Sequence, residues 1–209
     1  MGRDMATKAE KPAWMREHGR PWRRGGEATA WENPWLAIRT YDAVAPTGQP
    51  AHYGVVHMKN HAIAVLPLHE DGTVTLVGQN RFVFADYSWE IPEGGGPLDE
   101  APLEAARREL REECGLEAAN WEKILEVQVS NSVTDELAFG FLATGLTKAQ
   151  TAPDETEDLQ VARVPFGEAL EAATAGFIKD ALTVAMLLRL HHMAVKGQLT
   201  GSLGQLVLG

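Results

Sequence analysis

The length, composition and charge of the chain exclude several classes of protein. Its 209 residues suit one main domain, and 44% hydrophobic with 23% charged residues argue against a wholly disordered chain. A formal net charge of −10 argues against tight binding to a DNA or RNA backbone, but it permits a small phosphorylated substrate held through a metal. Cys114 is the single cysteine, so an internal disulfide is excluded. The lone cysteine fits a reducing cytosol, so we expect a cytoplasmic protein, and the lack of a run of about 18 apolar residues predicts no transmembrane helix.

The first half of the chain is expected to contain an N-terminal arm followed by strands. Residues 1–34 are rich in Arg, Gly and Trp, and we interpret them as an arm that is mobile or associated with a second subunit. The main domain is expected over residues 35–195. Its short apolar runs between Pro- and Gly-rich turns predict strands over residues 36–44, 51–58, 62–68, 73–79 and 88–91.

The second half is expected to contain helices packed on further strands. Apolar residues recur along one stripe of residues 100–114, which predicts a helix that Asp99 caps and Gly115 ends. Later patterns predict strands over residues 124–130, 137–144 and 159–164, helices over 167–174 and 180–194, and a Gly-rich tail over 196–209. This order of elements predicts an α+β fold, a mixed α/β/α sandwich with N-terminal antiparallel strands.

Three glutamates of the predicted helix are candidates for metal binding. At about 100° per residue, Glu109, Glu112 and Glu113 fall within an arc of roughly 100° at the border of the apolar stripe. Like charges at this spacing repel by roughly 0.2–0.5 kcal/mol, so something must offset them. On the evidence of the helix alone, we favour neighbouring arginines on a solvated helix face as the groups that offset this repulsion. Hard Mg²⁺ or Mn²⁺ is the alternative, and the preceding Gly-rich loop, residues 94–96, adds support because glycines let backbone approach a ligand closely.

The residues from Gly94 to Leu116 carry a family resemblance. They resemble a complete Nudix box, whose residues at fixed spacing are here Gly94, Glu100, Arg108, Glu109, Leu110, Glu112, Glu113, Gly115 and Leu116. Agreement at every position is hard to reach by chance on a solvated helix. The resemblance implies a Nudix hydrolase, which cleaves a nucleoside diphosphate linked to another group and whose box forms a loop–helix–loop.

The resemblance also implies roles for residues of the box. Glu109, Glu112 and Glu113 would bind Mg²⁺, for which Mn²⁺ can substitute, and the backbone carbonyl of Glu93 would be a further ligand. Arg108 would orient the glutamates through charge-assisted hydrogen bonds. Arg108, Glu112 and Glu113 are therefore expected to be catalytic, with a metal-activated water attacking phosphorus.

Segments outside the box resemble ADP-ribose pyrophosphatases and other nucleotide-sugar hydrolases. Arg81, in a Gln-x-Arg segment, is expected to contact the pyrophosphate or the base, or else to form a surface ion pair. Trp89, in a Trp-Glu-x-Pro-x-Gly segment, is a candidate for substrate stacking, although for Trp89 and Phe82 core packing is favoured. Glu155 of an acidic loop is the expected general base, with Glu157 as its alternative.

The resemblance leaves the substrate and the assembly open. Residues 129–136 lack a proline that ADP-ribose pyrophosphatases often carry there, which weakens ADP-ribose as the substrate, and Ser132 would hydrogen-bond a sugar or belong to an ordinary turn. The alternatives are a Nudix hydrolase of dinucleoside polyphosphates, NADH or coenzyme A, and a non-catalytic nucleotide-binding module. Nucleotide-sugar members are homodimers with exchanged N-terminal strands, so we expect a homodimer and no nucleic acid or membrane partner.

Overall fold

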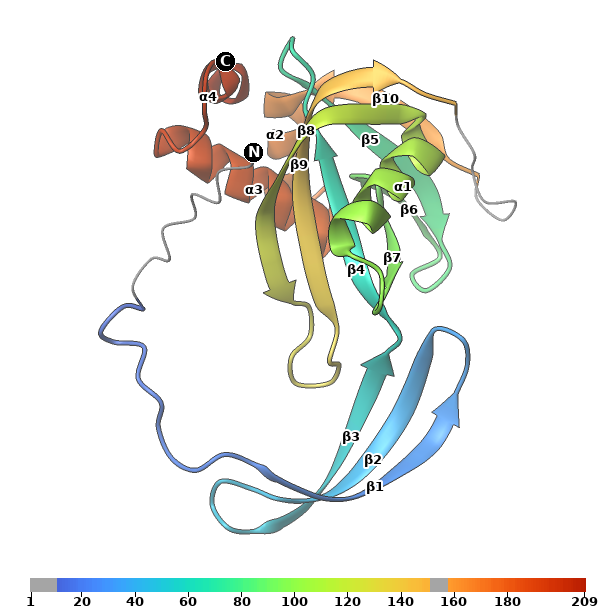
Figure 1. Ribbon diagram of the computed structural model, residues 1–209, viewed down its shortest axis with the longest axis vertical. Coiled ribbons are helices and arrows are strands. Elements are labelled where there is room, and N and C mark those ends of the chain that lie inside the picture. The colour runs from blue at the N-terminus through green and yellow to red at the C-terminus, as the bar shows by residue number, and fades with distance from the viewer. Residues whose placement is uncertain (1–10, 151–157) are drawn as a thin grey trace.

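The computed structural model describes residues 11–150 and 158–209 (Figure 1). Within these residues the chain forms three sheets and four helices, and the predicted α+β class is confirmed. The N-terminal sheet has the order β1-β2-β3, the central sheet has the order β7-β4-β9-β8, and a third sheet has the order β10-β5-β6.

The N-terminal sheet projects away from the rest of the molecule, as Figure 1 shows. Its strands β1 (Arg23–Glu32), β2 (Leu36–Val44) and β3 (Pro50–Met58) pair antiparallel. Every residue of β1 is exposed to solvent. The arm expected over residues 1–34 therefore contains a strand that pairs with β2, although the strand buries none of its own residues.

Strand β4 (Asn60–Pro67) forms the middle of the molecule because both of its faces are covered. Ile63 and Val65 face a core cluster with α1, while Ala64 and Leu66 face a second cluster with α2 and α3. Successive side chains of a strand point to opposite faces, so a continuous apolar run suits a strand buried on both sides. β4 pairs parallel with β9 (Leu137–Lys148) and antiparallel with β7 (Glu93–Pro97).

The remaining strands complete the central sheet and form the third sheet. β8 (Leu116–Gln128) pairs with β9 and is longer than the strand predicted over residues 124–130. The third sheet consists of β5 (Thr73–Arg81), β6 (Asp86–Glu90) and β10 (Gln160–Pro165), all antiparallel.

The helices cover the central sheet from two sides and confirm the sandwich. α1 (Pro102–Cys114) packs against β4 and β7, while α2 (Phe166–Thr174) and α3 (Ala181–Val195) pack in the other cluster. Short α4 (Leu203–Leu208) lies in the Gly-rich tail, for which the sequence predicted no structure, and its Val207 is buried in the α2–α3 cluster.

Three local expectations need correction. α1 begins at Pro102 after Ala101 and its N-cap makes no side-chain hydrogen bond, so the predicted cap by Asp99 is wrong. The residues expected as a Gly-rich loop, 94–96, instead lie in strand β7 at the edge of the central sheet. Phe82 is 98% exposed, so core packing was the wrong interpretation of that side chain. The predicted helix end is confirmed, because Gly115 has a φ of 60° that suits glycine.

Candidate active site

The glycines of β7 let helix α1 lie directly over the strand. A Cβ atom on Gly94 would stand 2.4 Å from Cδ of Glu109, and one on Gly96 would stand 2.9 Å from Cβ of Ala105. Both distances are shorter than real carbon contacts, so a larger residue at Gly94 would displace the Glu109 carboxylate or α1, and one at Gly96 would displace α1. The glycines thus serve the approach of the carboxylate-bearing helix to the sheet edge.

The three box glutamates differ in burial. Glu109 and Glu113, one helical turn apart, are buried, whereas Glu112 is half-exposed. The backbone N–H of Glu93 donates a hydrogen bond to Oε2 of Glu113 at 3.0 Å. This hydrogen bond joins the start of β7 to the last turn of α1.

Arg108 links the other box residues. Its Nη1 donates to Glu109 Oε1 at 2.6 Å and to Glu112 Oε2 at 3.3 Å, and its Nη2 donates to the carbonyl of Gly95 at 2.9 Å. Glu100 Oε2 lies 3.5 Å from the same Nη2. Burial disfavours the charged guanidinium, but the neighbouring glutamates outweigh it and raise the pKa of Arg108. These contacts place Arg108 beside two of the glutamates that it was expected to orient.

The donor set around Gly94 fits a hard divalent cation. Glu109, Glu112 and Glu113 offer carboxylate oxygens from one helix face, and the guanidinium of Arg108 pairs with Glu109 and Glu112. Carboxylate oxygens are the ligands that Mg²⁺ and Mn²⁺ prefer, and Mg²⁺ uses few of them because it keeps water and phosphate ligands. The box can therefore hold such an ion beside a substrate phosphate.

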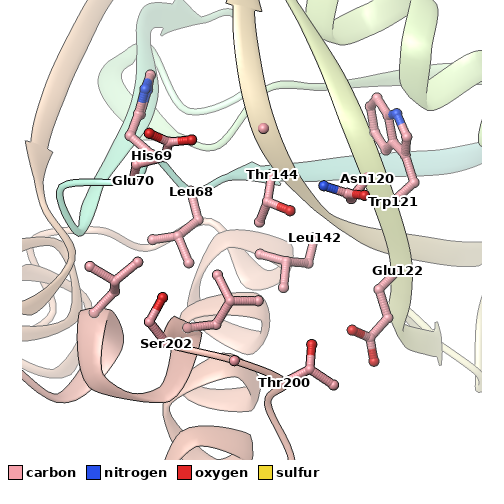
Figure 2. Close-up of a pocket in the computed structure, with 14 residues that line it drawn as sticks. Leu68, His69, Glu70, Asn120, Trp121, Glu122, Leu142, Thr144, Thr200 and Ser202 are labelled. Carbon is pink, nitrogen blue, oxygen red and sulfur yellow. The ribbon is translucent and has the colours of Figure 1, made fainter.

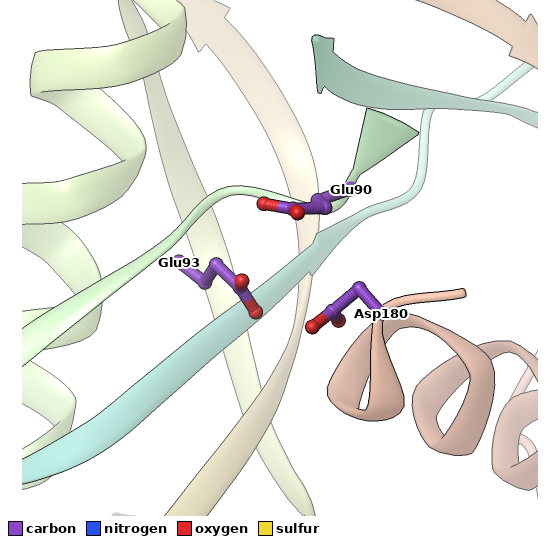
Figure 3. A group of neighbouring side chains, drawn as sticks. All are labelled: Glu90, Glu93 and Asp180. Carbon is purple, nitrogen blue, oxygen red and sulfur yellow. The ribbon is translucent and has the colours of Figure 1, made fainter. Parts of the chain in front are cut away.

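A second group of charged residues lies beside the box. Arg81 Nε donates to Glu90 Oε1 at 3.0 Å, Nη2 makes a further short contact with Glu90, and Nη2 also donates to Glu93 Oε1 at 2.9 Å. The side chain of Asp180, which caps α3, points toward Glu90 and Glu93 (Figure 3). Hydrogen bonding to Glu90 raises the pKa of Arg81, so this guanidinium stays charged.

The environment of Glu93 disfavours its charged form. Burial, then the charges of Asp180 and Glu90, hold the pKa of the Glu93 carboxyl well above its usual range, while Arg81 acts in the opposite direction. Glu93 lines a pocket of about 610 Å³ together with Arg81 and with the exposed apolar side chains of Phe82, Val83, Phe84 and Phe177. A pocket lined by both charged groups and exposed aromatic rings suits a nucleotide-like ligand.

Two of the predicted substrate-binding residues lie apart from α1. Trp89 is partly buried and packs against the α2–α3 cluster, with Tyr87 in edge contact at a ring-centroid distance of 5.9 Å, as the core-packing alternative expected. The carbonyl of Ser132 accepts a hydrogen bond of 2.8 Å from the Tyr53 hydroxyl. Ser132 lines a cavity of about 210 Å³ between the N-terminal sheet and the β8–β9 connection. Glu155, the expected base, lies outside the described residues.

A larger cavity, of about 680 Å³, lies between α4 and strands β8 and β9 (Figure 2). Glu70, Asn120, Trp121, Thr200 and Ser202 are among its lining residues. None of the site residues predicted within the described parts of the chain lines it. Its size alone therefore does not mark it as the active site, since the glutamates and arginines that can act on a phosphate lie elsewhere.

Sequence reasoning named neither Glu90 nor Asp180 as a site residue. Glu90 stands in the Trp-Glu-x-Pro-x-Gly segment, and Asp180 begins the helix predicted over residues 180–194. Glu90 is close to Glu93 in sequence, whereas Asp180 is distant along the chain and reaches both only through the packing of α3 against the sheet. The carboxylate at the N-cap of α3 was the available signal, because Asp at that position caps a helix.

Comparisons with known proteins agree with this geometry. The family model described as NUDIX domain matches residues 58–183. An ADP-ribose pyrophosphatase of Mycobacterium tuberculosis is 32% identical over 135 residues, 62% of this chain and 64% of that protein, so the chain spans just under two thirds of that relative. A GDP-mannose pyrophosphatase of Cronobacter sakazakii is 32% identical over 173 residues, 76% of this chain and 86% of the relative.

A solved structure shares the fold. It is described as an ADP compounds hydrolase, and it superposes with a TM-score of 0.77 at 20% identity, covering 88% of this chain and 98% of the other. Among the helices of the described residues, none combines the length and apolar character needed to cross a membrane.

Proposed function

The chain belongs to the NUDIX domain family, and from that premise we propose that it hydrolyses the pyrophosphate bond of a nucleoside diphosphate sugar, with ADP-ribose as the leading substrate. The family match and the relatives confirm the family and the hydrolase class that the box predicted. ADP-ribose and GDP-mannose are the compounds in the names of the relatives, and both contain a diphosphate between a nucleoside and a sugar.

The observation that carries the proposal is the packing of α1 over Gly94, which collects the box carboxylates at the edge of the central sheet. Glu109, Glu112, Glu113 and the backbone carbonyl of Glu93 are the proposed ligands of Mg²⁺ or Mn²⁺. Such an ion, when bound, neutralises phosphate charge and lowers the pKa of a coordinated water. Arg108 positions Glu109 and Glu112, and the amide of Glu93 positions Glu113.

The neighbouring residues supply binding and proton transfer in this proposal. Arg81 stands at the pocket beside the box and would contact the substrate diphosphate while it stays paired with Glu90. Ser132 would act on a sugar hydroxyl. Glu155, with Glu157 as the alternative, would take a proton from the attacking water.

The test is an assay of the purified protein against a panel of substrates. The purified protein is incubated with ADP-ribose, GDP-mannose, ADP-glucose, NADH, coenzyme A and a diadenosine polyphosphate, each with Mg²⁺ and with Mn²⁺, and products are separated by chromatography. ADP-ribose is expected to yield AMP and ribose 5-phosphate. Turnover confined to coenzyme A or dinucleoside polyphosphates would overturn the substrate class, and folded protein that cleaves no compound would overturn the activity.

We also propose a homodimer that forms through the N-terminal sheet. Trp31 of β1 and Trp35 of the β1–β2 connection are 52% and 64% exposed, an unusual solvent exposure for large apolar rings. Light scattering coupled to size-exclusion chromatography tests the assembly, and a monomer at micromolar concentration would contradict it.

A further inference from the structure

Three carboxylates from three different elements converge beside the box. Glu90 ends β6, Glu93 begins β7 and Asp180 caps α3, and one oxygen of each lies within 4.8 Å of the others. Figure 3 shows the side chains directed toward a common space. We refer to Glu90, Glu93 and Asp180 as the acidic trio.

The cations around the acidic trio can offset only part of the charge that three ionised carboxylates would carry. Arg81 pairs with Glu90 and Glu93, which leaves an excess of two negative charges if all three carboxyls are ionised. Lys179, next to Asp180 in sequence, is 75% exposed and instead lies 3.8 Å from Asp86. Like charges at such short range repel strongly when they are shielded from water. Among the described residues, Arg81 alone pairs with the trio, so ionisation of all three carboxyls requires a further cation.

A buried oxygen points to what is missing. Oε2 of Glu93 is buried and has no hydrogen-bonding partner among the described residues, whereas Oε1 of the same carboxylate pairs with Arg81. Buried polar atoms in native proteins nearly always have a partner, and an ion is one of the few explanations for an exception. The unpaired oxygen is an observation separate from the convergence of the trio, because a carboxylate in an acidic cluster can have both of its oxygens paired.

We propose that Glu90, Glu93 and Asp180 bind a hard divalent cation at a site separate from the box. Three carboxylates from β6, β7 and α3 match the all-oxygen donor sets of Mn²⁺, Mg²⁺ and Ca²⁺, and a double charge balances the excess that Arg81 leaves. Glu93 lies between the two sites, with its amide on Glu113 and its carboxylate in the trio. The ion fastens the N-terminus of α3 to the sheet edge at the wall of the 610 Å³ pocket. This inference does not depend on hydrolase activity.

The experiment counts Mn²⁺ by electron paramagnetic resonance and follows Tm in the full chain without substrate. Glu109→Gln/Glu113→Gln, which weakens the box, is expected to retain one bound Mn²⁺ and a Mn²⁺-dependent rise in Tm. Adding Asp180→Asn, which keeps an acceptor for the Thr183 amide, is expected to abolish both. Asp86→Asn is the matched control, because Asp86 lines the same pocket outside the trio, and its Mn²⁺ count stays that of the parent.

Two outcomes would overturn the trio site. One is a box double variant that folds and binds no Mn²⁺. The other is a box double variant that still binds one Mn²⁺ after Asp180→Asn is added and also after Glu93→Gln is added. If the box double variant does not fold, the single Asp180→Asn and Glu93→Gln variants decide: each is expected to bind one Mn²⁺ fewer than wild type, and an unchanged count overturns the site. Loss of hydrolysis with retained trio binding would count against the proposed function alone.

Discussion

Two groups of carboxylates meet at Glu93, and they are held in different ways. Glu109 and Glu113 stand one turn apart on α1, and Arg108, from the same helix, holds Glu109. The acidic trio draws its members from three separate elements, and Arg81 pairs with two of them, Glu90 and Glu93. One helix can therefore place several carboxylates side by side through its own periodicity, whereas carboxylates from three elements come together only when the whole domain has packed.

The largest expected difference between the groups concerns catalysis. Glu113→Gln keeps the acceptor for the Glu93 amide but removes the ligand charge, so kcat is expected to fall by several orders of magnitude while the fold persists. Steady-state kinetics with ADP-ribose and circular dichroism measure the two properties. Glu104→Gln is the control, since Glu104 is exposed on the same helix and pairs with Arg107. Near-normal kcat in Glu113→Gln would contradict a catalytic box.

The close approach of α1 to β7 gives the second prediction. Gly94→Ala places a Cβ against the Glu109 carboxylate, so the helix or the carboxylate must shift. Misplacement of a catalytic group by about 1 Å can cost roughly 10²-fold in rate, and overpacking costs about 1–3 kcal/mol of stability. Gly95→Ala is the matched control, because its Cβ would meet Asn60 Nδ2 at 3.4 Å. Equal kcat and unfolding free energy in both variants would show that the approach does not matter.

The arginine of the box provides a smaller effect. Arg108→Lys keeps the charge but cannot reach Glu109, Glu112 and the Gly95 carbonyl together, so kcat is expected to fall roughly tenfold with little change in Tm. Arg107→Lys on the exposed side of the same helix serves as the control. An unchanged kcat in Arg108→Lys would mean that the glutamates stay oriented without the hydrogen bonds from the guanidinium group of Arg108.

The smallest effect is expected at a cross-element pair outside both groups. Asp135 Oδ2 lies 2.5 Å from His57 Nδ1 and joins the N-terminal sheet to the β8–β9 connection. Burial opposes ionisation of Asp135, but hydrogen bonds from His57 and the Met58 amide outweigh it and lower the pKa of the carboxyl. The pair therefore adds stability above the usual carboxyl pKa and loses it as pH falls through the lowered pKa.

Asp135→Asn tests this sign. The variant is expected to lose about 0.2–1 kcal/mol of unfolding free energy near pH 6, because the pair is partly exposed. The difference from wild type should shrink as the solution is acidified, and denaturant titrations across pH measure it. A difference that grows on acidification would contradict the lowered pKa.

The sequence predicted the box well because its chemistry is local. The helix that carries Glu109, Glu112 and Glu113 follows from apolar periodicity, and Gly115 marks its end through a backbone conformation that suits glycine. Family resemblance then supplied the hydrolase class. The predicted cap by Asp99 failed because Pro102 starts the helix without a side-chain cap.

The sequence by itself determined the family and the box residues, because both depend on spacing within a short segment, and it determined the α+β class through the order of locally encoded strands and helices. Tertiary structure alone decided that Gly94 lies beneath Glu109 in a paired strand, that Arg81 is shared by Glu90 and Glu93, and that Asp180 joins them. The physical reason is distance along the chain. A carboxylate at the start of α3 meets the sheet edge only after the α2–α3 cluster has packed against β4, and no local pattern encodes that packing.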